Sequence, residues 1–512
     1  MFKNILLSIY FTTTCLWVQA QDKAVHKTIY NIKDFGAIGD GLQLDSKAIN
    51  KTIEAAAMAG GGTIYFPAGN YLSGTLHLKN NISLFLDQGC TLIAAPVSAT
   101  NGYDEEEQTV NTIYQDAGHS HWQNSLIAGE NLHDISIVGQ GKIWGKGLYK
   151  DYVKGSKQNA NKAISLLLCR NVTISDITIL QGGWFAILAT GVDNLTINNI
   201  KIDTNRDGMD IDCCSNVHIS NCSVNSPYDD GICLKSTYAL GFARATENVT
   251  ITNCMVSGYD EGSFLDGTFK RSKNDQYGNN PTGRIKFGTE SNGGFKNITV
   301  SNCVFDYCRG FALETVDGGL LEDVTISNIT MRDITNAPIF LRLGARMRGP
   351  KQVPVGALRR IAISNIIAYN IDPSQGIFIS GIPDHYIDDI QLNNIKLYFK
   401  GGGKKEAIVQ PVPEQENEYP EPGKFGTLPA YGIYIRHVKN ILLNNIDLHL
   451  LSDDTRAAIM MQDVQGTAFR FVQAPNKVSD PILILKEVSN FHLFQSLNME
   501  DKRLEKIINQ QW

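Results

Sequence analysis

The stretch NVTISDITI from Asn171 decides the fold, because it returns as NLTINNIKI from Asn194 and as NVHISNCSV from Asn216. In each copy apolar and polar residues alternate and β-branched side chains are frequent, which is typical of β-strands. The Asn, Asp or Ser-Asn between the two apolar runs is typical of a tight turn. Each copy is therefore predicted to be a strand, a turn and a second strand.

The same unit recurs along most of the chain. Further copies begin at Asn248, Asn297, Asp323, Arg360, Asp389 and Asn440. The closest copies are about 22 residues apart, a spacing that indicates stacked structural repeats. A single unit cannot bury its own apolar face, whereas stacked units pair their strands in parallel and bury it. We therefore predict an all-β fold, a single-stranded right-handed parallel β-helix. Its turn asparagines are expected to hydrogen-bond one another and the local backbone rather than to bind a ligand.

The two ends of the chain differ from these repeats. Residues 1–20 contain Lys3, an apolar run and a small residue at Ala20, which is the pattern of a signal peptide. Residues 21–95 are predicted to form an N-terminal cap with the first coils, including a short helix over 48–58 that plugs the open end of the core. Residues 96–490 are predicted to be the catalytic β-helix domain and 491–512 a C-terminal tail. The Glu- and Pro-rich stretch 414–429 is interpreted as a loop inserted into one coil.

Composition narrows the functional classes. The net charge is −6, so the chain has no global basic field of the kind that attracts nucleic acid. After the first twenty residues, no apolar stretch approaches the roughly 18 residues of a membrane span. We expect a secreted or periplasmic monomer with no nucleic-acid partner and no membrane insertion. Of ten cysteines, nine follow the signal segment; this odd number argues against a complete disulfide framework, and we interpret them as small core residues.

Three aspartates are the candidate catalytic residues. Asp207 lies in NRDGMDID, and Asp229 and Asp230 lie in SPYDDGICLKS, one coil length later. Since neighbouring parallel strands are about 4.8 Å apart, Asp207 is expected to stack on Asp229 and the three carboxyl groups to meet. Crowded carboxylates raise at least one pKa, which keeps an acid protonated. Glycoside hydrolysis needs such an acid together with an ionised carboxylate. A calcium site made from the same carboxylates is the alternative that this spacing leaves open.

These motifs resemble a known family. DFGAIGDG from Asp34, the glycines leading into FPAGNY, and the NxDGxD and DDGICLKS blocks are similar to the polygalacturonases of glycoside hydrolase family 28. The resemblance implies hydrolysis of galacturonic-acid-containing pectic polysaccharide with inversion, no metal and no organic cofactor. It implies that Asp229 is the general acid and that Asp207 and Asp230 position and deprotonate water. It also implies that Lys235 holds a uronate or tunes the acids.

The chain departs from this family at two positions. Thr282 stands where the family usually carries the histidine of a Gly-His-Gly, and Ala312-Leu313-Glu314 replaces an Arg-Ile-Lys that binds the substrate carboxylate. Because cations recognise carboxylates by charge-assisted hydrogen bonds, Glu314 is expected to weaken uronate binding. The hypothesis is that this subsite takes a neutral sugar or uses other cations. The candidates are Arg284, Lys286 and Arg309.

Two other functional classes stay open on sequence grounds. A β-helix polysaccharide lyase would need a basic side chain and usually calcium, and it would release unsaturated products. A glycan-binding β-helix protein without catalytic activity would leave the three aspartates without a use.

Overall fold

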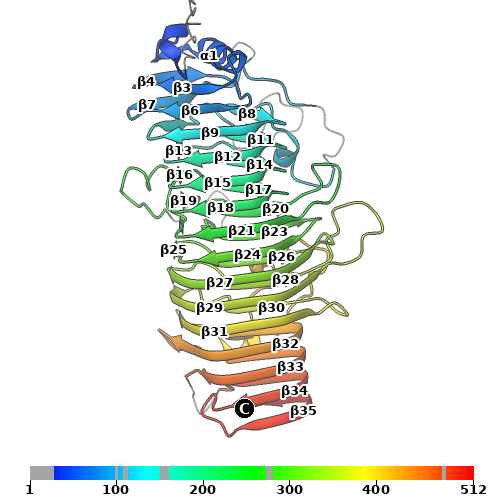
Figure 1. Ribbon diagram of the computed structural model, residues 1–512. Helices are drawn as coiled ribbons and strands as arrows, with labels where there is room; N and C mark the ends of the chain where they lie inside the picture. The colour runs from blue at the N-terminus through cyan, green and yellow to red at the C-terminus, as the bar shows by residue number, and fades with distance from the viewer. Residues whose placement is uncertain (1–27, 99–101, 108–112, 150–160, 273–280, 476–479) are drawn as a thin grey trace, which may run out of the picture.

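The computed structural model describes residues 28–98, 102–107, 113–149, 161–272, 281–475 and 480–512. These residues form a right-handed parallel β-helix, as predicted. Figure 1 shows the strands stacked along one long axis, with α1 at one end and β34 and β35 at the other. Each strand pairs in parallel with its counterpart on the next coil, because only this stacking satisfies the backbone hydrogen bonds of every coil.

The strands fall into three columns along this axis. The column that carries the candidate site, here called the site sheet, consists of β5 (Leu76–His77), β8 (Ile127–Glu130), β11 (Ile164–Leu167), β14 (Phe185–Thr190), β17 (Asp207–Asp212), β20 (Ile232–Ser236), β23 (Ile285–Ser291), β26 (Phe311–Thr315), β28 (Ile339–Leu343) and β30 (Ile377–Ser380). The second consists of β1 (Ile29–Asn31), β3 (Gly62–Phe66), β6 (Ile82–Leu86), β9 (His133–Gly139), β12 (Arg170–Ser175), β15 (Asp193–Asn198), β18 (Ser215–Ser220), β21 (Thr246–Thr252), β24 (Phe295–Ser301), β27 (Leu320–Arg332), β29 (Ala357–Ile371), β31 (Ile387–Phe399), β32 (Ala430–Leu450), β33 (Ala457–Gln473) and β34 (Leu483–Phe494). The third consists of β2 (Asp40–Leu44), β4 (Gly69–Ser73), β7 (Cys90–Ala94), β10 (Lys142–Trp144), β13 (Thr178–Leu180), β16 (Lys201–Asp203), β19 (Ser223–Asn225), β22 (Met255–Ser257) and β25 (Val304–Asp306).

Like residues stack in register inside the helix. Val172 pairs with Leu195, Leu195 with Val217 and Val217 with Val249, and all four side chains are buried. The nine cysteines among the described residues are buried and free, which confirms their interpretation as small core residues. The repeated apolar positions thus form one continuous core.

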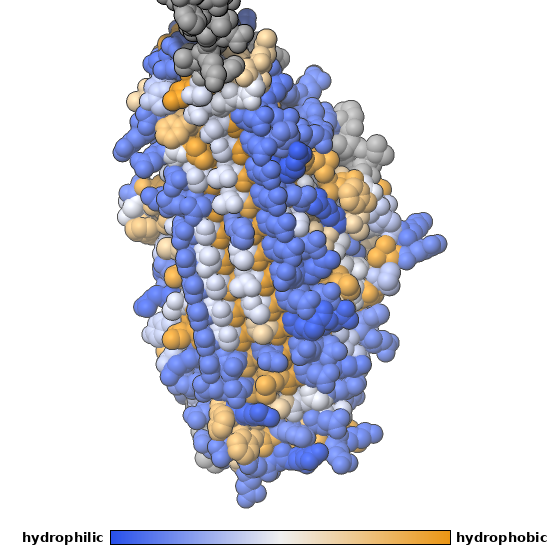
Figure 2. Space-filling model, in the orientation of Figure 1, coloured by the Kyte–Doolittle hydropathy of each residue, from blue (hydrophilic) through white to orange (hydrophobic). Residues whose placement is uncertain are grey.

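The turn asparagines form a ladder on the outside. Asn194 donates to the side-chain oxygen of Asn171 at 2.9 Å, Asn216 to Asn194 at 3.2 Å and Asn248 to Asn216 at 3.1 Å. Each has a φ between 55° and 58°, a left-handed conformation that Asn tolerates better than most residues. Figure 2 shows a hydrophilic ridge that follows the long axis of the molecule. The structural interpretation of these asparagines is confirmed.

Both ends of the core are covered. The 3-10 helix η1 (Ile32–Phe35) and α1 (Ser46–Met58) lie at the N-terminal end. Helix α1 buries Ile49, Ile53 and Ala56 on one face, which confirms the predicted capping helix. At the other end, β35 (Lys502–Gln511) pairs antiparallel with β34, so the predicted C-terminal tail contains an edge strand that covers the last coil.

The predicted signal peptide lies outside the described residues, so it and export from the cell stay predictions. Within the residues that the structure describes, no helix combines the length and the hydropathy that crossing a membrane requires.

Candidate active site

The three candidate aspartates lie on two adjacent coils, at the start of neighbouring strands of the site sheet. Asp207 is the first residue of β17, and Asp229 and Asp230 form the turn before β20. Met209 pairs with Ile232, which places Asp207 level with Asp230. The expectation that Asp207 stacks on Asp229 is therefore wrong by one residue. Register follows the apolar side chains that face the core, since a slip of one residue would turn them outward.

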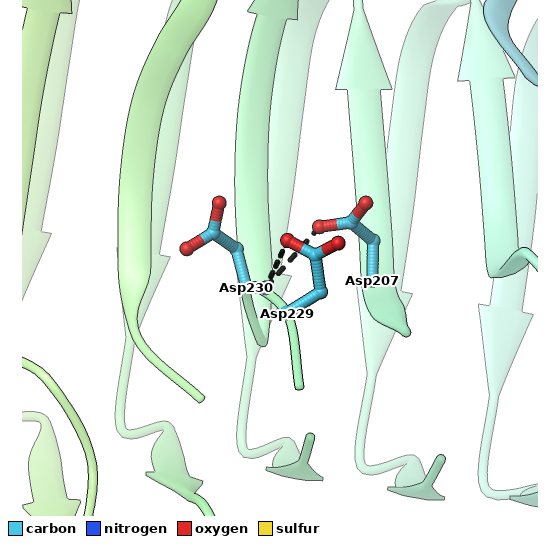
Figure 3. Close-up of side chains that lie close together, drawn as sticks. All are labelled: Asp207, Asp229 and Asp230. Carbon is cyan, nitrogen blue, oxygen red and sulfur yellow. Dashed lines mark hydrogen bonds between the residues drawn. The ribbon is translucent and has the colours of Figure 1, made fainter. Parts of the chain in front are cut away.

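The carboxyl groups nevertheless gather. One oxygen from each of the three lies within 4.8 Å of the others. The backbone N–H of Asp230 donates to Oδ1 of Asp229 at 3.0 Å and to Oδ1 of Asp207 at 3.2 Å. Figure 3 shows the carboxyl groups of Asp207 and Asp229 close together, whereas that of Asp230 points to the other side.

Two cations of the next coil bind Asp230. Arg284 donates from Nε to Oδ1 at 2.8 Å, and Lys286 Nζ lies 3.3 Å from Oδ2. Burial alone would raise the pKa of Asp230, but Lys286, Arg284 and Lys235 together hold it below its usual value. Asp230 is therefore an ionised carboxylate.

The pKa of Asp207 is shifted in the opposite direction. It is only 4% exposed, and burial together with the negative charges of Asp210 and Asp229 raises its pKa well above the usual value. The side chain of Asp229 is 28% exposed and lies 3.4 Å from Nη2 of Arg206. The cluster thus combines a carboxyl group with a lowered pKa, one with a raised pKa and one that is accessible to solvent.

The other predicted cations, Lys235, Lys286 and Arg309, all pair with acidic side chains. Lys235 donates to Glu290 at 3.1 Å, and Lys286 Nζ lies 3.7 Å from an oxygen of Glu314. Glu314 is fully buried, and burial raises its pKa to about 6 against the opposing charges of Lys286 and Arg284. It therefore faces the cations of the site sheet rather than solvent. Arg309 lies 3.1 Å from Glu421.

The structure brings in residues that the repeat pattern did not indicate. Tyr419 accepts a hydrogen bond from Lys286 at 2.8 Å, and Glu421 lies 3.1 Å from Arg284. Both belong to the predicted loop 414–429. His119, in the 3-10 helix η2 (Ala117–Ser120), has its Nε2 3.2 Å from an oxygen of Asp210. In the sequence, only the length of the insertions indicated that such residues exist, because side chains on loops do not follow the two-residue alternation of a strand.

The pair of His119 and Asp210 gives a stability prediction. Burial opposes the charged imidazole, yet Asp210 raises the pKa of His119 above its ordinary value of 6.5. Its contribution to stability is therefore complete below pH 6.5 and is lost as the pH rises through the higher folded-state pKa.

We expect His119→Gln to lower the free energy of unfolding by roughly 1 to 3 kcal/mol near pH 5.5 and by less as the pH rises through the raised pKa of His119. Denaturant unfolding at a series of pH values measures this difference, with His218→Gln on the exposed face of β18 as the control. A loss that does not vary with pH would contradict the prediction.

The donor set of the three aspartates argues against a calcium site. Their oxygens are close enough to share an ion, but Arg284 and Lys286 already bind both oxygens of Asp230. Calcium prefers six to eight oxygen ligands, and two cations at the site oppose a third. The residues present fit a carboxylate acid–base pair better than a calcium ion.

Known proteins with similar sequences support the resemblance to the polygalacturonases independently of the site geometry. Residues 29–132 match the family model described as rhamnogalacturonase A/epimerase, pectate lyase-like, and residues 153–280 match the right-handed β-helix region model. A probable polygalacturonase of Vitis vinifera is 25% identical over 434 residues, which span 78% of this chain and 81% of the relative.

Solved structures show the same fold. The family 28 exopolygalacturonase of Yersinia enterocolitica aligns with a TM-score of 0.58 and 18% identity over 92% of this chain and 78% of its own. The exopolygalacturonase of Thermotoga maritima aligns with a TM-score of 0.57 and 16% identity over 95% of both chains. Similarity to a polygalacturonase along most of both chains supports the resemblance to the polygalacturonase family that the aspartate motifs indicated.

Proposed function

We propose that the protein is a glycoside hydrolase that cleaves α-glycosidic bonds of galacturonic-acid-containing pectic polysaccharide. The observation that carries this proposal is the opposite direction of two pKa shifts within one cluster. Arg284 and Lys286 bind Asp230 and lower its pKa, whereas burial and like charge raise the pKa of Asp207. Neighbouring carboxyl groups with opposite pKa shifts can divide the roles of acid and base.

The roles follow from access as well as from charge. The carboxyl groups of Asp207 and Asp229 lie close together, so one proton can serve both, and Asp229 is the member that solvent reaches. Asp229 then donates this proton to the glycosidic oxygen as its bond to the anomeric carbon breaks. A water molecule forms the new bond to that carbon and loses a proton to ionised Asp230. The resemblance assigns the same acid to Asp229, whereas the base role that it implies for Asp207 is disfavoured by the raised pKa of that group.

The stereochemical outcome is part of the proposal. Inverting glycosidases usually hold their carboxyl groups about 6.5 to 9.5 Å apart, whereas here the nearest oxygens lie within 4.8 Å. Inversion is therefore proposed from the family resemblance and not from this distance. Proton NMR of freshly formed product distinguishes the two outcomes, because an inverting enzyme releases the β-anomer from an α-linked substrate.

Location and assembly are proposed on sequence grounds. The apolar segment after Lys3 supports export to the periplasm or the medium, where pectic polymers are accessible. We propose that the exported chain acts as a monomer, without nucleic acid and without insertion into a membrane.

One assay separates this function from its alternatives. The purified protein is incubated with homogalacturonan and rhamnogalacturonan fragments, with and without a chelator, while reducing ends and ultraviolet absorbance are followed. We expect new reducing ends without absorbance and no effect of the chelator, because the acid–base pair needs no metal. Absorbance that depends on calcium would identify a lyase, and binding without products would identify a glycan-binding protein.

A further inference from the structure

The segment between β31 and β32, here called the covering segment (residues 400–429), packs on the outer face of the site sheet. Its Phe425, in the 3-10 helix η4 (Pro422–Phe425), contacts Phe340 and Phe378 with ring centroids 6.2 and 4.9 Å apart. A second 3-10 helix, η3 (Lys405–Val409), lies earlier in the same segment. The aromatic contacts tie the covering segment to the rigid sheet.

Two buried arginines hold the backbone of the covering segment, Arg342 of β28 and Arg436 in the first part of β32, which pairs with β30 and continues the site sheet. Arg342 donates to the carbonyl oxygen of Glu414 at 2.7 Å, and Arg436 donates to that of Pro413 at 2.6 Å. Both arginines are at most 1% exposed. Charged donors without water make strong hydrogen bonds, so the covering segment is a fixed wall of the site.

This wall presents a carboxylate to the site cations. Oε2 of Glu421 lies 3.1 Å from Nη2 of Arg284 and 3.1 Å from Nη1 of Arg309. Its other oxygen accepts a hydrogen bond from the amide of Asn336 at 2.8 Å. Burial would raise the pKa of Glu421, but Arg284 and Arg309 keep it below the usual value. Two guanidinium groups and an amide around one carboxylate are donors that suit the carboxylate of a uronate equally well.

The Arg284 side chain links this carboxylate to the catalytic cluster. Its Nε binds Asp230 at 2.8 Å while its Nη2 binds Glu421. The guanidinium group of Arg284 therefore bridges the carboxylates of Asp230 and Glu421. Glu421 lies toward the coils that follow β23.

A pocket of about 570 Å³ lies against Glu421. Its lining consists mainly of hydroxyl, amide and glycine groups with a few charged side chains, contributed by Arg309, Thr335, Asn336, Asp372, Ser374, Gln375, Glu421, Gly423, Lys424, Gly426 and Thr427. Hydroxyl and amide groups suit the hydroxyl groups of a sugar. Both cations of the lining are paired with acids, Arg309 with Glu421 and Lys424 with Glu418. Asp372 and Glu421 would repel a second carboxylate placed in the pocket.

We propose that Glu421 fills the carboxylate position of the cationic subsite, so that the sugar bound in this pocket is neutral. This inference rests on the proposed function and deepens it. The substrate is then a pectic oligomer that joins galacturonate to a neutral sugar, and Glu421 is the residue that sets this preference. Glu314 acts in the same direction, since its charge partly offsets that of Lys286.

The test uses binding, so that it does not depend on turnover. Asp229→Asn, alone or combined with Glu421→Ala or Glu421→Gln, is titrated by calorimetry with a galacturonate oligomer and with an oligomer that alternates galacturonate and rhamnose. We expect the parent to prefer the alternating oligomer. Each Glu421 change is expected to shift the ratio of the two dissociation constants toward the galacturonate oligomer by roughly 10- to 100-fold, because two arginines are released.

Glu406→Ala is the matched control, since Glu406 lies in η3 of the same segment, is exposed and does not line the pocket. Glu421→Gln keeps the shape of the side chain, so it guards against a collapsed segment in Glu421→Ala. An unchanged ratio in both Glu421 variants would overturn the inference. If the ratio shifts but the wild type never releases reducing ends from either oligomer, the inference stands for binding and only the proposed hydrolysis fails.

Discussion

Asp229→Asn is expected to lower kcat on pectic oligosaccharides by roughly 10²- to 10⁴-fold, the usual contribution of a general acid. Asparagine keeps the acceptor oxygen for the N–H of Asp230 but cannot donate a proton to the departing oxygen. The fold should therefore persist while the chemistry is lost. Initial rates of reducing-end release measure the effect.

The control for this change is Asp193→Asn on β15, an aspartate that pairs with Arg244 away from the cluster. Its kcat is expected to equal that of the wild type. A kcat for Asp229→Asn within a fewfold of the wild type, with Asp207→Asn inactive, would move the acid role to Asp207. Such a result would mean that the proton is delivered from the group with the raised pKa and not from the accessible one.

Arg284→Gln is expected to destabilise the protein by roughly 3 to 5 kcal/mol near neutral pH, the usual result of removing one partner from a buried ion pair. Asp230 and Glu421 would both lose their shared cation. Because the pKa of Asp230 is depressed, its contribution to stability is present above the ordinary value of 3.8 and is lost as the pH falls through the lower folded-state value. The loss in Arg284→Gln should therefore shrink in acid.

Denaturant unfolding between pH 2 and pH 7 tests this prediction, and Arg360→Gln on the exposed surface of β29 is the control. The same substitution should move the acid limb of the pH profile of kcat/KM to higher pH, because Asp230 then protonates more readily. Equal stability of Arg284→Gln and the wild type at pH 7 would show that Lys286 alone holds the charge of Asp230.

The sequence repeat predicts the aspartate cluster but not its exact register. The period of about 22 residues correctly brought Asp207, Asp229 and Asp230 together, because neighbouring coils lie one strand spacing apart. It missed the register by one residue, since core packing of Met209 against its neighbours and not chain length fixes the pairing. Arg284 and Lys286 were predicted as cations of a substrate subsite, and the structure places both on Asp230, since they follow on the next coil of the same sheet.

The sequence by itself determined the repeated elements of this protein: the parallel coils, the asparagine ladder and the column of catalytic candidates. These features are periodic, and each position repeats the environment of the position one coil earlier. Only the tertiary structure decided where the inserted segments lie, and with them the contacts of Tyr419, Glu421 and His119. The residues of an insertion do not follow the repeat. Their position depends on contacts with buried arginines and aromatic side chains of other coils.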